Sequence, residues 1–350
     1  MLPTISYQTL IDKAAKNLIP LRCLFELTYT CNLSCIHCYI VKNFKKKELT
    51  KNEIFRILDQ LSEAGCLYLT LSGGEIFCRK DFFDIASYAR KKEFALTLFT
   101  NGTLITKEIA KRIKELYPLR VEISLYGFEN IHDKITTVSG SFKKTCNAIK
   151  LLVERGIKVL IKTALMRQNV NEIWRLKAFV EKLGAKMRGI GGGLLLSPCD
   201  DGNRRPLNYR LTDSQLKKYL REEFEQLKIS GQNYKPREVK QNEKLCGAGF
   251  ATSNINPYGE LNPCVQIRCK NNGIKNRPLM KVWKEHREIK RLRSLHMFDR
   301  KECRNCQFIS YCFICPGIAL LEKGSLLSKL PEACRQAKIR KEVYASYYTS

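Results

Sequence analysis

The residues best suited to chemistry are three cysteines near the amino terminus, Cys31, Cys35 and Cys38. They form the pattern Cys-x3-Cys-x2-Cys directly after a strand-like segment at residues 22–30, which predicts a loop at the end of a strand. Three closely spaced thiolates can hold three corners of an iron–sulfur cube, which leaves the fourth iron open to another ligand. The alternatives are a zinc ion whose fourth ligand is His37, or cysteines that are simply buried.

A second set of cysteines lies in the carboxyl-terminal third of the chain. Its members share closely patterned spacings and are Cys246, Cys264, Cys303, Cys306, Cys312, Cys315 and Cys334. Seven thiolates could ligate two iron–sulfur cubes almost completely, and Cys269 is a further thiol nearby. Zinc is again the alternative. However, the two Cys-x2-Cys pairs are separated by only five residues, whereas ribbon-type zinc sites separate their pairs by about 15–20 residues.

The composition is that of a folded globular protein. The 350 residues are 44% hydrophobic and 27% charged, which is too apolar for a disordered chain. No run of about 18 apolar residues is present, so neither a transmembrane helix nor a membrane partner is predicted. Charges at Asp12, Lys13 and Lys16 interrupt the stretch that a signal peptide would need to be apolar. A cytoplasmic location is therefore expected, where cysteines favour metal binding over disulfides.

The chain is strongly basic, with 62 Lys and Arg residues against 34 Asp and Glu residues. The basic residues cluster at Lys42, Lys45, Lys46, Lys47 and Lys51, and again at Lys235, Arg237 and Lys240. A lysine-rich, solvated surface is the simplest interpretation, and an anionic partner, either an acidic peptide or a nucleic acid, is the alternative. No nucleic-acid partner is expected, because no basic stretch is interleaved with aromatic residues.

The first 200 residues alternate strand-like and helix-like segments in about six units. The pattern predicts strands at 67–71, 95–99, 119–125 and 157–165 and helices at 52–64, 81–92 (opened by Asp81), 106–116, 142–154 and 172–183. Such alternation favours parallel strands joined by crossovers, in an open sheet or in a full or partial barrel. Chemistry is then expected at the carboxyl ends of the strands. The last predicted strand, 187–196, is interrupted by glycines at 191–193.

Three regions follow from this pattern. Residues 1–210 form the α/β domain and end in a polar, turn-rich segment. Residues 211–239 form a linker that begins with an amphipathic helix. Residues 240–350 form a cysteine-rich domain in which few strands or helices are expected, and metal ligation would supply its missing stability.

The Cys-x3-Cys-x2-Cys loop after the first strand of an α/β chain resembles the hallmark of the radical S-adenosylmethionine (SAM) enzymes. The resemblance implies a partial (β/α)6 barrel of the TIM type with a carboxyl-terminal iron–sulfur domain. It also implies that Cys31, Cys35 and Cys38 bind a [4Fe–4S] cluster whose open iron is chelated by SAM. One electron from the cluster would cleave SAM to a 5′-deoxyadenosyl radical, which abstracts hydrogen from the substrate. No acid or base residue is assigned.

Later motifs are similar to those that contact SAM in this family. The expected cofactor-binding residues are Gly73, Gly74, Glu75, Asn101, Ser124 and Lys162. The resemblance implies that Gly73-Gly74-Glu75 binds the SAM amino group, although Ile76 stands where a proline usually follows. Asn101 and Ser124 match segments beside SAM. Lys162 is included because its ammonium group could pair with the methionine carboxylate.

The carboxyl-terminal cysteines resemble the SPASM extension of these enzymes, which carries two auxiliary [4Fe–4S] clusters. The crossed ligation of that family implies that auxiliary cluster I takes Cys246, Cys264 and Cys315. Auxiliary cluster II then takes Cys303, Cys306, Cys312 and Cys334. Cluster I lacks an evident fourth ligand, which Cys269 or a substrate could supply. One departure is that two residues, not the usual three, separate Cys312 from Cys315.

The resemblance implies a radical SAM enzyme whose substrate is a ribosomally made peptide or protein. A reductase or flavodoxin-type electron donor is implied as a partner. Only about 30 residues precede the first cluster, so any leader-binding domain is expected on a separate protein. The alternatives are tetrapyrrole or quinone cofactor biosynthesis, a nucleic-acid-modifying radical enzyme, and a zinc-stabilised binding protein without catalysis.

Overall fold

The structure, a computed structural model, describes residues 6–41, 46–187 and 195–348. Its centre is a sheet with the strand order β6-β5-β4-β3-β2-β1-β7-β8. The strands are β1 (Arg22–Thr28), β2 (Tyr68–Gly73), β3 (Ala95–Thr100), β4 (Arg120–Ser124), β5 (Val159–Lys162), β6 (Lys186–Met187), β7 (Thr252–Ile255) and β8 (Leu261–Asn262). Strands β1 to β7 pair in parallel, and β8 pairs antiparallel with β7. The six strands of the predicted α/β domain are thus adjacent in chain order, as successive crossovers require.

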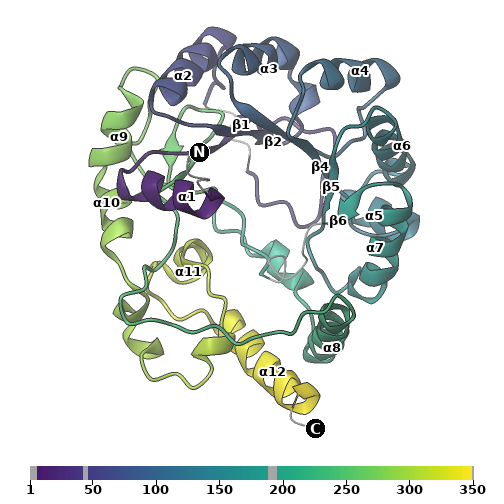
Figure 1. Cartoon of the computed structure of the whole chain (residues 1–350), viewed down its shortest axis with the longest axis vertical. Helices are drawn as coiled ribbons and strands as arrows, with labels where there is room; N and C mark the ends of the chain where they lie inside the picture. The colour runs from purple at the N-terminus through teal and green to yellow at the C-terminus, as the bar shows by residue number, and fades with distance from the viewer. Residues whose placement is uncertain (1–5, 42–45, 188–194, 349–350) are drawn as a thin grey trace, which may run out of the picture.

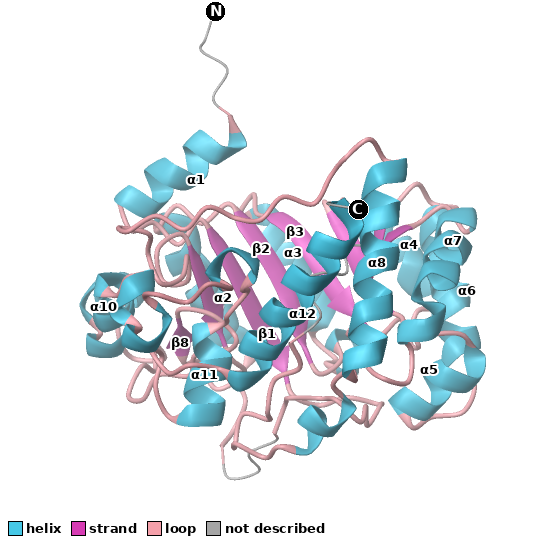
Figure 2. Ribbon diagram, turned by 90° about the horizontal axis from the view of Figure 1, so that it is seen from below, coloured by secondary structure: helices cyan, strands magenta, loops and turns pink. Residues whose placement is uncertain are grey.

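Twelve α-helices accompany the sheet in the described residues. They are α1 (Tyr7–Lys16), α2 (Lys51–Glu63), α3 (Phe82–Lys91), α4 (Lys107–Glu115), α5 (Glu129–Thr136), α6 (Ser141–Val153), α7 (Ile173–Lys182), α8 (Asp213–Ile229), α9 (Leu279–Glu285), α10 (Arg287–Ser294), α11 (Pro316–Lys323) and α12 (Pro331–Tyr348). Figure 1 shows the sheet as an open, curved wall with α2 to α7 along its outer side. Helices α8 and α12 pack side by side on the open side of the curved sheet, away from α2 to α4, and lie in front of the strands in the view of Figure 2. The predicted α/β fold, an open partial barrel, is confirmed. None of the helices in the described ranges is long and apolar enough to span a bilayer.

Side chains alternate along the strands, so the sheet has one apolar and one polar face. Phe25 and Leu27 of β1 are completely buried in the same hydrophobic core as Ile54 of α2. Glu26 lies between them in the strand and is also completely buried, as is Glu122 of β4. A buried carboxylate is costly unless it is paired, and both of these carboxylates have basic partners on the polar face.

Local sequence explains where several helices begin. Thr50 and Glu53 form a reciprocal capping box at the start of α2. Asp81 stands at the start of α3, as predicted, but it makes no capping hydrogen bond. Its carboxylate instead accepts from Arg79, at 2.7 Å from Nε, and Arg79 also donates to the carbonyl oxygen of Leu27 at 3.0 Å. The Arg79–Asp81 pair therefore ties this turn to β1.

Three predictions about secondary structure were wrong or incomplete. Helix α5 was not expected at all. The carboxyl-terminal region contains four helices, α9 to α12, and its strand β7 extends the sheet beside β1. Its strands are too short, and β7 too polar, for periodicity to reveal them. Of the predicted strand at 187–196, β6 includes only Met187, and residues 188–194 with their three glycines lie outside the described residues.

Candidate active site

The three amino-terminal cysteines lie on the loop that follows β1. The N–H of Ile36, within this loop, donates to the carbonyl oxygen of Ile135 at 3.0 Å. The N–H of Cys38 donates to the carbonyl oxygen of Cys35 at 3.1 Å. Helix α5, which the sequence did not reveal, therefore supports the cysteine loop from the side.

The thiols of this loop affect one another electrostatically. The pKa of Cys35 is raised to about 12, mainly by burial and then by the charges of Cys38 and Cys31. Burial also raises the pKa of Cys38, and the charge of Cys31 adds to that effect. Thiolates that are partly desolvated and repel one another need a nearby cation to stay ionised. A metal centre bound by all three would supply that charge.

The spacing of the ligand atoms argues against the zinc alternative. A single zinc ion with Zn–S bonds of about 2.3 Å brings its sulfur ligands to within about 4 Å of one another. In the part of the chain that the structure describes, the only group of three His, Cys, Asp or Glu residues whose ligand atoms all lie within 4.8 Å is Cys269, His286 and Glu288. Among the described residues, neither set of patterned cysteines contains three ligand atoms that meet this spacing. His37 packs edge-on against Tyr126, with ring centroids 4.6 Å apart, and burial lowers its pKa to about 4.

Gly73 and Gly74 bring the end of β2 against the end of β1. A Cβ atom on Gly73 would overlap the carbonyl oxygen of Thr28, and one on Gly74 would overlap that of Thr30. The N–H groups of Gly74 and Glu75 donate to these two carbonyl oxygens at 2.7 and 2.9 Å. The close approach that requires glycine is therefore an approach between two strands. The resemblance implied only that this segment binds the SAM amino group.

Glu75 is completely buried and joins the ends of β2 and β3. One carboxylate oxygen accepts from the Thr100 hydroxyl at 2.7 Å and from the N–H of Phe77 at 3.2 Å. The other accepts from the N–H of Asn101 at 2.7 Å. Burial raises the pKa of Glu75 to about 7, although these donors act in the opposite direction. In this structure the side chain positions two strand ends and is closed to solvent.

Asn101 lies beside the cysteine loop. Its amide Nδ2 donates to Oδ1 of Asn32 at 2.9 Å and lies 3.9 Å from Sγ of Cys31. Asn32 in turn donates to the hydroxyl of Thr103 at 2.8 Å. The structure therefore brings the segment after β3 next to the first cysteine.

Ser124 and Lys162 are register partners at the ends of β4 and β5. Nζ of Lys162 lies 3.5 Å from the centre of the Phe99 ring and 3.8 Å from the Glu122 carboxylate. Glu122 also accepts from Nε of Arg120 at 2.6 Å. Lys162 is thus a residue of the polar sheet face with a carboxylate partner in the protein.

A buried polar network that the sequence did not reveal joins the two cysteine regions. Arg268 donates to Glu26 and to Asp200, each at 3.0 Å. The hydroxyl of Tyr39, the residue after Cys38, donates to Glu26 at 3.2 Å. The network therefore links β1 and the cysteine loop to the carboxyl-terminal region. An acidic residue inside an apolar strand was the one sequence signal that could have revealed it.

The carboxyl-terminal cysteines fall into two groups by their electrostatic interactions. The pKa of Cys264 is raised to about 12, first by burial and then by nearby charges that include Cys246 and Cys315. Burial raises the pKa of Cys312 to about 11, and further thiols raise it as well. The second group consists of Cys303, Cys306, Cys312 and Cys334. These interactions group Cys264 with Cys246 and Cys315, and they group the other four thiols with one another; Cys269 also interacts with Cys264.

Arg300 interacts electrostatically with thiols of both groups. It is only 1% exposed, and burial lowers its pKa. The thiols whose charges act on it are Cys303, Cys312, Cys315 and Cys246. Its guanidinium donates to the carbonyl oxygen of Leu326 at 2.9 Å, while its buried Nε has no hydrogen-bond partner among the described residues. A buried cation with an unused N–H fits a site that holds negative clusters. The sequence did not single out Arg300, because it is one of 62 Lys and Arg residues and belongs to no motif.

The chain matches the family model described as the radical SAM superfamily over residues 25–180. A similar protein is the antilisterial bacteriocin subtilosin biosynthesis protein AlbA of Bacillus subtilis (strain 168), which is 34% identical over 257 residues. That alignment covers 70% of this chain and 55% of AlbA, so the chain spans about half the length of this relative. The AdoMet-dependent heme synthase of Methanosarcina barkeri (strain Fusaro / DSM 804) is 26% identical over 334 residues, which cover 88% of this chain and 94% of that protein.

Solved structures show the same fold. Streptococcus suis SuiB bound to S-adenosylmethionine superimposes with a TM-score of 0.70 at 17% identity, covering 93% of this chain and 82% of SuiB. SuiB bound to its precursor peptide SuiA superimposes with a TM-score of 0.68. The cysteine loop at the end of β1 and the match over residues 25–180 lead to one conclusion. Residues 25–180 form a radical SAM domain, a family that implies a [4Fe–4S] cluster and SAM as cofactors.

Proposed function

We propose that this enzyme modifies a ribosomally made peptide or protein by abstracting a hydrogen atom from it. The observation that carries the proposal is the position of Cys31, Cys35 and Cys38 on one supported loop at the carboxyl end of β1, inside the segment that matches the radical SAM family model. Two relatives favour a peptide substrate. AlbA is a biosynthesis protein of a bacteriocin, and SuiB was solved with a precursor peptide.

The residues around the loop fit the cofactors of the family. When bound, the cluster and SAM supply the 5′-deoxyadenosyl radical that removes hydrogen from the substrate. Cys31, Cys35 and Cys38 would hold the cluster. The residues proposed to bind and orient SAM are Gly73, Gly74, Glu75, Asn101, Ser124 and Lys162, which lie at the ends of β2 to β5. Within this set, Glu75 acts by holding the strand ends together, because its own oxygens are engaged in the protein.

The carboxyl-terminal region would hold two auxiliary [4Fe–4S] clusters. We assign Cys246, Cys264 and Cys315 to the first cluster, and Cys303, Cys306, Cys312 and Cys334 to the second. The two electrostatic groups of thiols support this assignment, as does the buried Arg300, which interacts with thiols of both groups. The proposed domains are residues 1–210 for the radical SAM barrel, 211–239 for the linker helix, and 240–350 for the auxiliary clusters.

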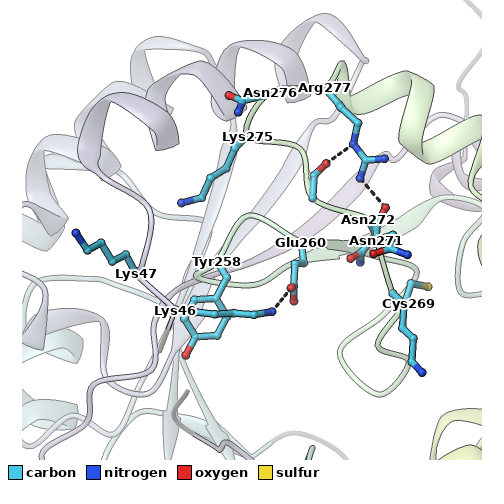
Figure 3. A pocket seen from close by; sticks show the side chains of 12 residues that line it. Lys46, Lys47, Tyr258, Glu260, Cys269, Asn271, Asn272, Lys275, Asn276 and Arg277 are labelled. Atoms are coloured by element: carbon cyan, nitrogen blue, oxygen red, sulfur yellow. Dashed lines mark hydrogen bonds and ion pairs between the residues drawn. The ribbon is translucent and has the colours of Figure 1, made fainter. Parts of the chain in front are cut away.

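A basic pocket supports an acidic segment in the peptide substrate. Its volume is about 870 Å³, and Figure 3 shows it between the segments that carry Lys46 and Arg277. Five basic residues line it, together with one carboxylate, Glu260. Lys46 pairs with Glu260, which leaves the pocket with a net positive lining. A separate leader-binding protein and a reductase or flavodoxin-type electron donor complete the proposed system.

A second candidate function is the modification of a tetrapyrrole. It is favoured by the alignment with AdoMet-dependent heme synthase, which extends over 94% of that protein. The basic pocket also suits the carboxylate groups of a tetrapyrrole, so the pocket does not distinguish the two candidates.

One experiment compares the two substrates directly. Anaerobically purified enzyme is incubated with SAM and dithionite, together with an acidic peptide encoded beside the gene or with an iron tetrapyrrole. We expect 5′-deoxyadenosine to accumulate together with a changed peptide mass, and peptide binding to weaken as salt is raised from 50 to 300 mM. Turnover of the tetrapyrrole with an unaltered peptide would replace the proposal with the second candidate.

A further inference from the structure

We propose that Cys269, His286 and Glu288 form a mononuclear zinc site with one open coordination position, separate from both auxiliary clusters. Cys269 lies on the loop after β8, His286 lies between α9 and α10, and Glu288 lies in the first turn of α10. One ligand atom from each lies within 4.8 Å of the others. This inference goes beyond the proposed function and does not depend on it.

The hydrogen bonds of His286 leave one ring nitrogen available for a metal. Nε2 lies 2.8 Å from the carbonyl oxygen of Lys270. Because a carbonyl oxygen can only accept, Nε2 carries the proton and donates it. In the neutral ring, Nδ1 then has a free lone pair. Nδ1 is buried and has no hydrogen-bond partner among the described residues. Metal-binding histidines have this arrangement, in which a carbonyl partner fixes the ring and its tautomer.

The other two ligands are also held in place by the protein. The thiol of Cys269 is in hydrogen-bond contact with the Glu288 carboxylate. The N–H of Lys270 donates to Oε2 of Glu288 at 2.8 Å, and the N–H of Cys269 donates to Oδ1 of Asn262 at 2.9 Å. Two groups that can both be anionic therefore face a histidine lone pair, an arrangement that a divalent cation stabilises.

The ligand set favours zinc over magnesium and calcium. One thiolate, one imidazole and one carboxylate are all normal ligands of Zn²⁺, whereas magnesium and calcium prefer oxygen ligands only. Three protein ligands leave a fourth tetrahedral position for water or for an anionic group. Cys269 also lines the basic pocket (Figure 3), so the site adjoins the surface that we propose for acidic substrates. Cys269 is then not the fourth ligand of auxiliary cluster I.

The test is metal analysis of the full-length, anaerobically purified enzyme from zinc-supplemented medium. We expect about one zinc per chain in addition to iron, with one sulfur neighbour at about 2.3 Å in zinc-edge X-ray absorption. Cys269→Ser and His286→Gln are expected to lose the zinc and keep their iron, and Glu288→Gln to bind zinc about 10-fold more weakly. His296→Ala and Glu285→Gln are matched controls that keep the zinc.

Three results would overturn the zinc site. They are wild-type enzyme without zinc, zinc that all three ligand variants retain, and a loss of about four irons per chain in Cys269→Ser. The last result would make Cys269 a cluster ligand instead. Retained iron in each variant shows that the chain is still folded. None of these measurements requires SAM cleavage, so failure of the zinc site and failure of the proposed function are distinguishable.

Discussion

The two cysteine regions differ in what holds them in place. The amino-terminal cysteines follow β1, a strand with completely buried side chains, and α5 supports their loop through backbone hydrogen bonds. Among the carboxyl-terminal cysteines, Cys303, Cys306 and Cys312 lie at or beside short 3₁₀ turns, and the turns Lys301–Cys303 and Ile309–Tyr311 contain no buried residue. In the first region the fold positions the thiols. In the second, metal bound by the thiols must position much of the chain.

Among the substitutions that test this difference between the two regions, Cys35→Ala is expected to have the largest effect on activity. SAM cleavage should be lost, because two thiolates cannot retain the cluster, while hydrogen-exchange protection of β1 to β5 stays within about 1 kcal/mol of the wild type. The readouts are 5′-deoxyadenosine formation and hydrogen-exchange mass spectrometry. Cys146→Ala, which removes a buried thiol in α6, is the control. Cleavage at the wild-type rate in Cys35→Ala would rule out the cluster assignment.

Cys306→Ala should affect the other region in the opposite way. Iron is expected to fall by about four atoms per chain, and protection should decrease across residues 297–340, because few buried apolar side chains there replace the metal. Strands β1 to β5 should keep their protection. Iron content and hydrogen exchange measure both effects in one preparation. Unchanged iron, or a loss of protection spread over the whole chain, would contradict the contrast between the regions.

Much of the first region could be predicted from sequence, because each element has its own local signal. Strands β1 to β4 lie within a few residues of their predicted bounds, and Thr50 with Glu53 marks the start of α2. Helix α5 was missed because Phe128, the residue before it, offers no capping side chain.

The features that depend on distant parts of the chain could not be predicted. Arg268 pairs with Glu26, which is 242 positions away in the sequence. No local sequence pattern around either residue predicts this ion pair. Strand β7 is four residues long, with Ser253 and Asn254 at its centre, so it has no apolar pattern and forms because β1 offers an open edge. The role of Arg300 could not be predicted, because its electrostatic interactions with both groups of thiols arise only in the folded chain.

Replacing Arg300 by methionine tests whether this arginine serves as a counter-charge for metal clusters in the carboxyl-terminal region. In the metal-loaded enzyme we expect the region at 297–340 to lose about 3–5 kcal/mol of protection, because negative clusters lose their buried counter-charge. In the metal-free chain the same change should have no effect, because the region is expected to lose its protection there whichever residue stands at position 300. Hydrogen exchange in both forms measures this, with Arg304→Met as the matched control. Equal losses in the two forms would show that Arg300 serves packing alone.

The smallest effect concerns Glu75, whose pKa is raised from an ordinary 4.5 to about 7 by burial. When the pKa of a carboxyl group is higher in the folded state than in the unfolded state, protonation of that group stabilises the fold. This stabilisation is fully present at pH values below the pKa of the unfolded state. That contribution is lost as the pH rises through the folded value. Relative to Glu75→Gln, the wild type should lose about 3 kcal/mol between pH 4.5 and 7. Hydrogen exchange of β2 and β3 amides, corrected for intrinsic rates, measures this difference. A pH-independent difference would mean that Glu75 is ionised throughout.

The most direct test of the amino-terminal site is the electron paramagnetic resonance spectrum of the reduced enzyme before and after addition of SAM. We predict that SAM shifts the signal of one cluster in the wild type and leaves the spectrum of Cys35→Ala unchanged. A wild-type enzyme with its full complement of iron whose spectrum does not respond to SAM would contradict the assignment of Cys31, Cys35 and Cys38.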